Sequence, residues 1–425
     1  MSPLDSKQNN GLTRWFGRVR QFSRDAHLYL AGAGLMGFGL GASWVFLNLW
    51  YKAIGLDEAA IGSLLSIASI GAMAVAIPAA VLVDRVPAGR LLALAAGGFA
   101  ASLAVPLLLP QWPVLVLASL AQGTLFTVHW VAAAPFFMRT ARPEDRGDLF
   151  GIAHAVETAA TLLAAVGVGW LVSHGTVWLG SERQGLELGL AVAALVTLGA
   201  VPCLAAIDSR PEPGPVKRWR DQVKAHDWRL LGKLVLPATL LGCGAGFVIP
   251  FMNLYFRNRF HLDAGAIGLV FAAGQVLTTG AFLLGPYMAR RLGSVTAIVT
   301  TELASIPFFL VLAFATNLPL AIGAFWIRGA LMQMNHPISS AFALELVPPE
   351  QQAVTNSVRH LAWNAAWAVS TQVGGVWIAR DGFTVPILAA VVLYLVASTS
   401  FWWFFRDKRG VAPRAVPVQQ VVQES

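Results

Sequence analysis

Apolar runs of about twenty residues, separated by short polar stretches, recur along almost the whole chain. A helix of that length crosses the hydrocarbon core of a membrane, which is about 30 Å thick. The chain is therefore predicted to be an all-α polytopic membrane protein with twelve transmembrane helices. The predicted spans are 27–50, 58–83, 88–109, 113–138, 149–173, 185–207, 231–256, 264–289, 294–316, 318–344, 353–379 and 382–405.

The composition supports a membrane protein. Hydrophobic residues make up 56% of the 425 residues and charged residues only 12%, whereas about a quarter of a soluble domain is charged. The only cysteines, Cys203 and Cys243, lie inside apolar runs, so we expect no disulfide framework, no metal cluster and no cofactor. About 25 polar and basic residues precede the first apolar run, which is unlike a cleavable signal.

The net charge of +8 has three possible meanings: nucleic-acid binding, attraction to a membrane surface, or topology. The basic residues cluster in tails and connectors rather than on one helix face, which argues against a nucleic-acid partner. If the connectors alternate between the two sides of the bilayer, one side receives most of the 30 Lys and Arg residues. The positive-inside rule then predicts cytoplasmic termini and a multi-pass protein of the plasma membrane, the inner membrane of a bacterium.

The two halves of the chain repeat at a fixed offset of 206 residues. The matching pairs are Leu56–Gly62 with Leu262–Gly268, His154 with His360, and Gly169 with Gly375. Parallel six-helix repeats joined by a long linker are typical of carriers that work by alternating access. The predicted parts are an N-terminal tail (1–26), a six-helix bundle (27–207), a cytoplasmic linker (208–230), a second six-helix bundle (231–405) and a C-terminal tail (406–425).

A charged turn follows the second predicted span and reads Asp84-Arg85-Val86-Pro87-Ala88-Gly89-Arg90. A degenerate copy lies at Arg290-Arg291-Leu292-Gly293. Both resemble the signature Gly-x-x-x-Asp-Arg-x-Gly-Arg of the major facilitator superfamily, with Ala80 in place of the first glycine and two extra residues before Gly89. The resemblance covers nearly the full length of the chain.

The resemblance implies two pseudo-symmetric six-helix bundles and a secondary active transporter rather than an enzyme. It also implies a latch that closes the cytoplasmic side. A carboxylate beside a helix N-terminus meets unpaired N–H groups, which makes such a latch physically reasonable. The alternative is a group of solvated charges that only fixes the topology. The latch residues would be Asp84, Arg85, Gly89, Arg90, Arg290 and Arg291.

Arg328 and Glu157 lie inside predicted spans, roughly 12–14 Å below the surface. An ionised group at this depth is expensive, which favours a cavity or a buried partner. The residues on Arg328's helix face are Phe325, Met332 and Asn335. The repeat gives Gln122, Phe126 and His129 as the counterparts of Arg328, Met332 and Asn335. The resemblance implies that both spans line a central cavity, so we expect these two faces to meet across it.

Glu157 is the preferred proton-coupling residue, with His154 on the same helix face as a relay. A buried carboxyl disfavours its charged form, and a cavity that opens to each side in turn would let it exchange a proton. The alternative is a glutamate held by hydrogen bonds to a neighbouring helix. The remaining cavity candidates are Trp44, Asn48, His336, Trp363, Asn364 and Trp367. We interpret Glu302 as structural.

These expectations combine into a monomeric transporter in the lipid bilayer. A cavity rich in aromatic residues and poor in charge suits a small amphipathic or drug-like organic solute, and we expect proton-coupled efflux. The first alternative is uptake of a small organic anion with Arg328 as counter-ion. The second is a transporter-like sensor without flux. The chain lacks Walker A, His-Glu-x-x-His and Gly-x-Ser-x-Gly motifs, which disfavours ATP-driven transport and hydrolysis.

Overall fold

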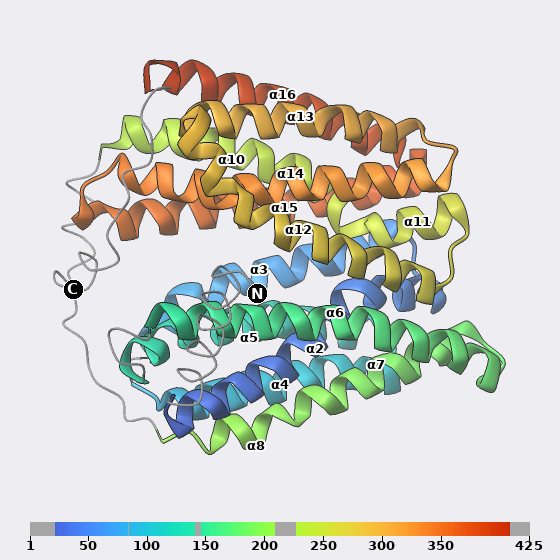
Figure 1. Cartoon of the computed structure of the whole chain (residues 1–425). Coiled ribbons are helices and arrows are strands. Elements are labelled where there is room, and N and C mark those ends of the chain that lie inside the picture. The colour runs from blue at the N-terminus through green and yellow to red at the C-terminus, as the bar shows by residue number, and fades with distance from the viewer. Residues whose placement is uncertain (1–21, 84, 141–145, 209–226, 409–425) are drawn as a thin grey trace, which may run out of the picture.

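The structure is a computed structural model that describes residues 22–83, 85–140, 146–208 and 227–408. Within these ranges every long element is a helix and no strand occurs (Figure 1). The first half contains α2 (Arg24–Ala53), α3 (Glu58–Val83), α4 (Ala88–Leu108), α5 (Trp112–Thr140), α6 (Arg146–Leu179), α7 (Glu182–Leu198) and α8 (Ala200–Ala205). The second half contains α10 (Trp228–Val248), η1 (Ile249–Phe251), α11 (Met252–Phe260), α12 (Ala264–Leu292), α13 (Ser294–Phe314), α14 (Leu318–Glu345), α15 (Pro349–Asp381), α16 (Thr384–Phe405) and η2 (Arg406–Lys408).

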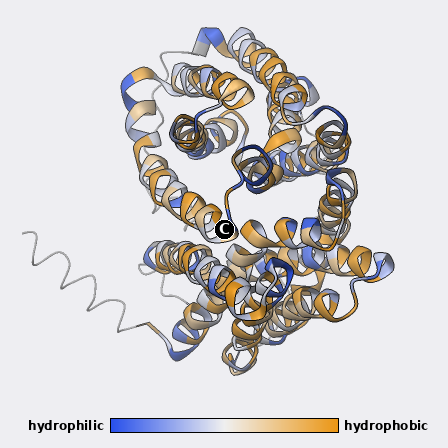
Figure 2. Ribbon diagram, turned by 90° about the vertical axis from the view of Figure 1, so that its right-hand side faces the viewer, coloured by the Kyte–Doolittle hydropathy of each residue, from blue (hydrophilic) through white to orange (hydrophobic). Residues whose placement is uncertain are grey.

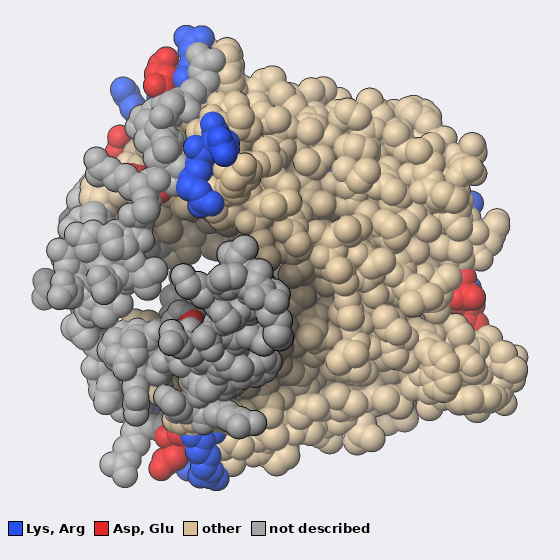
Figure 3. Space-filling view, viewed as in Figure 1, with Lys and Arg blue, Asp and Glu red and all other residues tan. Residues whose placement is uncertain are grey.

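The helices have the length and composition of membrane spans. Among the described residues, ten helical segments are long and apolar enough to cross a membrane. α14 and α15 fall outside that group, although their 28 and 33 residues would extend about 40 and 50 Å. On the face drawn in Figure 3, charged side chains gather at the two ends and leave the flank uncharged. The predicted all-α membrane fold is confirmed, whereas the count of twelve spans and the cytoplasmic termini stay predictions.

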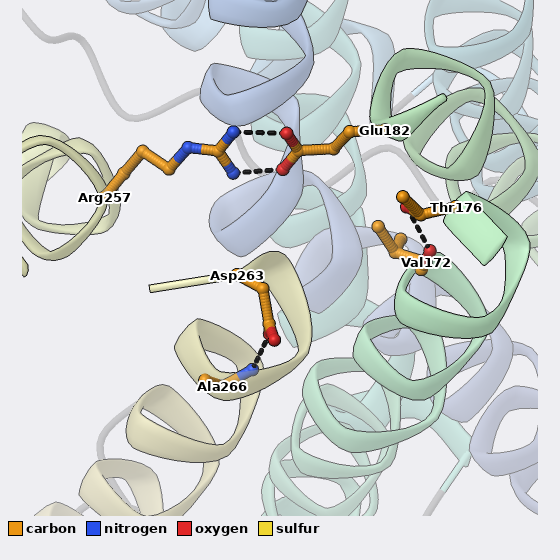
Figure 4. Close-up of polar contacts among 6 residues, drawn as sticks. All are labelled: Val172, Thr176, Glu182, Arg257, Asp263 and Ala266. Atoms are coloured by element: carbon orange, nitrogen blue, oxygen red, sulfur yellow. Dashed lines mark hydrogen bonds and ion pairs between the residues drawn. The ribbon is translucent and has the colours of Figure 1, made fainter. Parts of the chain in front are cut away.

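The repeated Leu-Asp segment forms the same helix start in both halves. The side chain of Asp57 accepts a hydrogen bond from the backbone N–H of Ala60 (2.8 Å) at the start of α3. The side chain of Asp263 accepts one from Ala266 (2.7 Å) at the start of α12, as Figure 4 shows. An aspartate just before a helix satisfies an otherwise unpaired N–H, so the repeated segment encodes a helix cap.

Each half is a bundle with the same pattern of helix neighbours. In the first half α2 packs against α6 and α7, α3 against α5, and α4 against α5 and α7. In the second half α10 packs against α15 and α16, α12 against α14, and α13 against α14 and α16. Figure 2, which looks along the helices, shows the two bundles one above the other. The two sets of neighbours correspond helix by helix, as the 206-residue offset leads us to expect.

The halves meet through two equivalent helix pairs, α3 with α15 and α6 with α12. A Cβ on Gly62 would lie 2.6 Å from the carbonyl oxygen of Thr371, and a Cβ on Gly268 would lie 2.3 Å from that of Ala165. Both contacts are too short for any side chain, so the repeated glycines allow the two backbones to touch. The 206-residue offset relates the two contacts to each other.

Candidate functional site

Buried amide groups join the two halves at one end of the molecule. We call the end that holds the connections from α2 to α3 and from α11 to α12 the distal end, and the opposite end, where α8 ends and α10 begins, the linker end. Asn48 of α2 donates through Nδ2 to the carbonyl oxygen of Pro250 (2.7 Å). Asn253 of α11 donates through Nδ2 to the carbonyl oxygen of Val45 (2.8 Å). Both asparagines are buried, so each bond holds α2 against the second half in place of water.

Charged side chains strengthen this junction at the distal end. Arg257 of α11 and Glu182 of α7 form an ion pair through two parallel hydrogen bonds (Figure 4). Glu58 of α3 accepts a hydrogen bond from Asn258 of α11 (2.9 Å) and pairs with Lys52 (2.8 Å). Bidentate arginine–carboxylate pairs have strict geometry, so this end of the molecule is closed by specific contacts. The linker end is hollowed between the halves on the face that Figure 3 shows.

Three titratable side chains meet inside the first half, on α2, α5 and α6. Nε2 of His129 lies 3.9 Å from Oε1 of Glu157, and the His129 ring stacks on that of Tyr29 with centroids 6.2 Å apart. His129 and Tyr29 are buried, whereas the Glu157 side chain keeps 14% of its surface exposed. Neither ring nitrogen of His129 has a hydrogen-bond partner among the described residues. We call these three residues the acid–histidine cluster.

The second half holds a different acidic centre, on α13, α14 and α16. Glu302 is only 2% exposed. Its Oε1 accepts a hydrogen bond from Nδ2 of Asn335 (2.8 Å), and its Oε2 accepts one from Oγ of Ser398 (2.7 Å). Both oxygens of the carboxyl group are thus fixed by neighbouring helices. This agrees with a structural role for Glu302, because the group ties three helices together.

Arg328 also lies inside the second half rather than in an open site. Its side chain is 6% exposed, and its guanidinium carbon lies 4.8 Å from the ring centroid of Phe309 on α13. The guanidinium interacts with the hydroxyl group of Tyr394 on α16, while its Nε has no partner among the described residues. The charge is therefore stabilised by an aromatic face and a hydroxyl group within the bundle.

Three of the residues on the two helix faces that were expected to meet across a cavity contact helices of their own half in this structure. Arg328 and Asn335 contact α13 and α16, and His129 contacts α2 and α6. Helical periodicity identifies which residues share a face, but it does not identify the helix that covers that face. The shared cavity surface therefore stays a prediction, since Arg328, Asn335 and His129 each contact helices of their own half in this structure.

A family comparison decides the kind of protein that carries these features. The family model of the Major Facilitator Superfamily matches residues 29–371 and 234–423. The chain belongs to the major facilitator superfamily. Members are transporters and not enzymes, so the two clusters lie in a transport protein.

Solved structures of the superfamily share this fold at low sequence identity. A bacterial homologue of the human lysosomal transporter Spinster, in an inward-facing and unoccupied conformation, is 15% identical, with a TM-score of 0.74 over 91% of this chain and 98% of that one. The nucleoside transporter NupG is 15% identical, with a TM-score of 0.74 over 90% of this chain and 100% of that one. The D-xylose–proton symporter is 16% identical, with a TM-score of 0.65 over 92% and 98% of the two chains.

A curated relative is similar over part of its length. The Na(+), Li(+), K(+)/H(+) antiporter of Planococcus maritimus is 24% identical over 186 residues, which cover 43% of this chain and 42% of that protein. The chain thus matches less than half of that relative. The similarity fits a superfamily transporter without assigning its solute.

The other predicted cavity residues differ in their exposure in this superfamily fold. Gln122, Met332, Trp363, Asn364 and Trp367 are half-buried. Trp44, Phe126 and His336 are exposed, whereas Asn48 belongs to the distal junction. The rings of Trp363 and Trp367 stack with centroids 6.2 Å apart, and the Asn364 side chain donates to its own helix at the carbonyl oxygen of His360 (2.9 Å).

The predicted latch is described only in part, because Asp84 lies outside the described residues. Gly89 is buried, and a Cβ there would lie 2.8 Å from the carbonyl oxygens of Leu204 and Ile207. Arg85, Arg90 and Arg290 are exposed. Arg291 is also exposed, with its guanidinium carbon 5.5 Å from the ring centroid of Tyr287. The latch therefore stays a prediction, and Gly89 serves the packing of α4 against α8 in this structure.

His154, the expected relay, is exposed and lies near the second half, with its ring centroid 6.5 Å from that of Phe282 on α12. The histidine that lies beside Glu157 is His129 instead. Sequence reasoning missed Tyr29, Tyr394 and the Arg257–Glu182 pair. An aromatic residue in an apolar run and a charge in a short connector give no signal of their own, since only their spatial neighbours distinguish them.

Proposed function

We propose that this transporter exchanges protons for a small amphipathic organic solute and exports that solute by alternating access. The observation that carries the proposal is the acid–histidine cluster, which puts Glu157 beside His129 within the bundle of the first half. The relative from Planococcus maritimus is named as a proton antiporter, which supports the choice of coupling ion.

Glu157 has the surroundings that a proton carrier needs. Its side chain is partly exposed, and the histidine beside it is charged only when it is protonated. The carboxyl group and the imidazole are both proton-binding groups, and their separation of 3.9 Å puts them side by side. Glu302 differs, because two neutral donors already hold both of its carboxyl oxygens.

The placement of Glu157 also suits alternating access. Glu157 and His129 both lie about 17 Å from the linker end of their helices, at 1.5 Å per residue. One turn further along α6, Thr161 donates to the carbonyl oxygen of Gly37 on α2 (3.2 Å), which fixes α6 against α2. With the distal end closed, a proton reaches Glu157 from the linker end. Rocking of the halves would reverse that access.

Two observations support an organic solute with apolar surface. Phe126 is exposed, and the stacked rings of Trp363 and Trp367 are half-buried. Aromatic faces that keep access to solvent bind amphipathic molecules well. Arg328 is a poor direct counter-ion for such a solute in this state, because Phe309 and Tyr394 already surround it.

A second candidate function is exchange of a monovalent cation for protons. The name of the curated relative favours it, and the coupling residue would be the same Glu157. The two candidates differ in the solute that discharges a pH gradient, so a single assay separates them.

The test uses purified full-length protein in proteoliposomes with an imposed pH gradient and a pH-sensitive dye inside. Solutes are added one at a time: 2-naphthalenesulfonate, 2-naphthalenesulfonamide, ethidium, Na⁺ and K⁺. We expect at least one organic solute to accelerate proton movement with wild-type protein. Glu157→Gln should abolish this acceleration, while Glu187→Gln, which changes a half-buried carboxyl group paired with Arg183 at the distal end, should retain it.

Three results would contradict the proposal. Proton movement that responds only to Na⁺ or K⁺ would establish cation exchange instead. A response to an organic solute that survives in Glu157→Gln would remove Glu157 from coupling. A protein that binds a solute in thermal-shift measurements but moves no protons with any solute is not proton-coupled.

A further inference from the structure

Three basic side chains meet between α14 and α15, on the linker side of the second half. Arg359 of α15 donates through Nη2 to Oγ of Ser339 on α14 (3.2 Å). His336 of α14 and His360 lie within electrostatic range of Arg359 and of each other. His336 and His360 are exposed, and Arg359 is half-buried. We call these three residues the basic cluster.

The basic cluster lacks a carboxylate partner. Among the described residues, no carboxylate lies within 4.0 Å of Arg359, whereas Arg257 and Arg183 each pair with a glutamate. Nε of Arg359 is buried and has no hydrogen-bond partner in the described part of the chain. A hydroxyl group on one guanidinium nitrogen leaves most of its donors free. An arginine inside a helix bundle whose donors are unpaired can bind an anion.

The cluster lies at the depth of the proposed coupling site. Arg359 and His336 are each roughly 15 Å from the linker end of their helices, close to the depth of Glu157 in the first half. α15 packs mainly against α3 and α10, whereas α14 packs mainly against α12 and α13. The two helices that carry the cluster therefore have different main neighbours, and the Arg359–Ser339 hydrogen bond joins them at this depth.

An aromatic surface continues from the cluster along the same face of α15. Trp363 and Trp367 follow Arg359 at spacings of four and eight residues, which puts all three on one side of the helix. The two indole rings stack, with 25° between their planes. A ligand that spans this face meets a guanidinium at one end and an apolar ring surface at the other.

We propose that the basic cluster and the two tryptophans form a binding site for an amphipathic organic anion, whose carboxylate or sulfonate group pairs with Arg359. This inference rests on the proposed function, because it names the chemical class of the solute that is exchanged for protons. It also places the counter-ion at Arg359 rather than at Arg328, which Phe309 and Tyr394 enclose. The histidines His336 and His360 add N–H donors beside the anionic group.

The test is equilibrium binding to full-length protein in nanodiscs of phosphatidylcholine, measured by calorimetry and thermal shift. The probes are benzoate, 2-naphthoate and 2-naphthalenesulfonate, each compared with its neutral amide. We expect the naphthyl anions to bind at least about tenfold tighter than their amides. Arg359→Gln should weaken anion binding by roughly 10- to 100-fold, the size of a lost hydrogen-bonded charge contact, and leave the amides unaffected.

Two control variants separate the site from general effects. Arg183→Gln removes an exposed arginine at the distal end and should leave binding intact. Trp367→Leu should weaken the binding of both the naphthyl anions and their amides, because it removes aromatic ring surface but no charge. A variant of Arg359 that does not fold is replaced by Arg359→Lys, which keeps the charge but loses the bidentate geometry, and we expect intermediate affinity.

A lipid headgroup could supply the same anionic chemistry, so the measurement is repeated in nanodiscs that contain phosphatidylglycerol. Loss of naphthoate binding there would show that the cluster holds lipid, and it would overturn the proposal. Equal binding of anions and amides, or unchanged anion binding in Arg359→Gln, would also overturn it. These measurements need no pH gradient. Anion binding can thus fail while Glu157-dependent proton exchange persists, and the reverse result is equally recognisable.

Discussion

Glu157 and Glu302 are two acids at similar depth in two halves that share one pattern of helix packing, yet their surroundings are opposite. Glu157 keeps 14% of its side chain exposed, and the group beside it is an imidazole 3.9 Å away. Glu302 is 2% exposed, and both carboxyl oxygens accept hydrogen bonds. The partners of an acid, and not its depth alone, decide whether it is available to a proton or acts as a cross-link between helices.

The internal repeat shows which positions produce the difference between the surroundings of the two acids. His129 on α5 and Asn335 on α14 are equivalent positions at the 206-residue offset, and each lies beside an acid. The histidine meets Glu157 on α6, whereas the asparagine meets Glu302 on α13, so the acids come from helices that are not equivalent. One position in the fold is thus used once for a titratable pair and once for a neutral amide donor.

The largest expected effect comes from making the first half resemble the second at this position. His129→Asn should reduce solute-driven proton movement roughly 5- to 150-fold, the range of ordinary coupling energies, because Glu157 loses its titratable partner. The measurement is the pH-gradient assay in proteoliposomes. His27→Asn alters an exposed histidine near the linker end and is the matched control. Full proton movement in His129→Asn would show that Glu157 works alone.

The second prediction concerns stability, to which we expect Glu302 to contribute more than Glu157. Glu302→Ala should lower the free energy of unfolding by about 1–3 kcal/mol, because Asn335 and Ser398 lose their acceptor in a buried site. Glu157→Ala should cost less than about 1 kcal/mol, since it releases no fixed donor. Thermal unfolding in detergent, followed by intrinsic fluorescence, compares the two. Equal losses would mean that Glu157 is also a cross-link.

The helices could be predicted from the sequence, because the hydrophobic period and the length of an apolar run are properties of residues that are neighbours along the chain. The predicted span 58–83 coincides with α3, and Asp57 and Asp263 cap helices where the repeated segment lies. Apolar runs bounded by polar residues contain this information directly. The repeat includes Gly62 and Gly268, but the close approach of the helices at these glycines became visible only in the structure.

The candidate site was less accessible to sequence reasoning, because it depends on which helix covers which face. Glu157 and His129 were both selected, but for separate roles, and their pairing became visible only in the structure. Arg328 was selected for its charge and proved to be enclosed by an aromatic ring and a hydroxyl group. Arg359 lies within the predicted span 353–379, but its free donors are a property of its spatial neighbours and only the structure shows them.

The third prediction tests the closed distal end that directs access to Glu157. Arg257→Ala should destabilise the distal-closed state by about 0.5–2 kcal/mol and change the solute-driven proton rate several-fold, because it removes a bidentate contact between the halves. Arg183→Ala is the control, as its salt bridge to Glu187 (2.8 Å) lies within α7. Identical rates in both variants would show that the Arg257–Glu182 pair does not bias the states.

The smallest expected effect separates the two donors that hold Glu302. Ser398→Ala should lower the free energy of unfolding by only about 0.6 kcal/mol, the mean for a side-chain hydrogen bond in a membrane protein, because Asn335 still holds the other oxygen. Ser400→Ala is the control, since that hydroxyl donates to its own helix at the carbonyl oxygen of Ala397 (2.8 Å). A loss as large as that of Glu302→Ala would mean that the serine alone fixes the acid, and Asn335 would then be free to act like its counterpart His129.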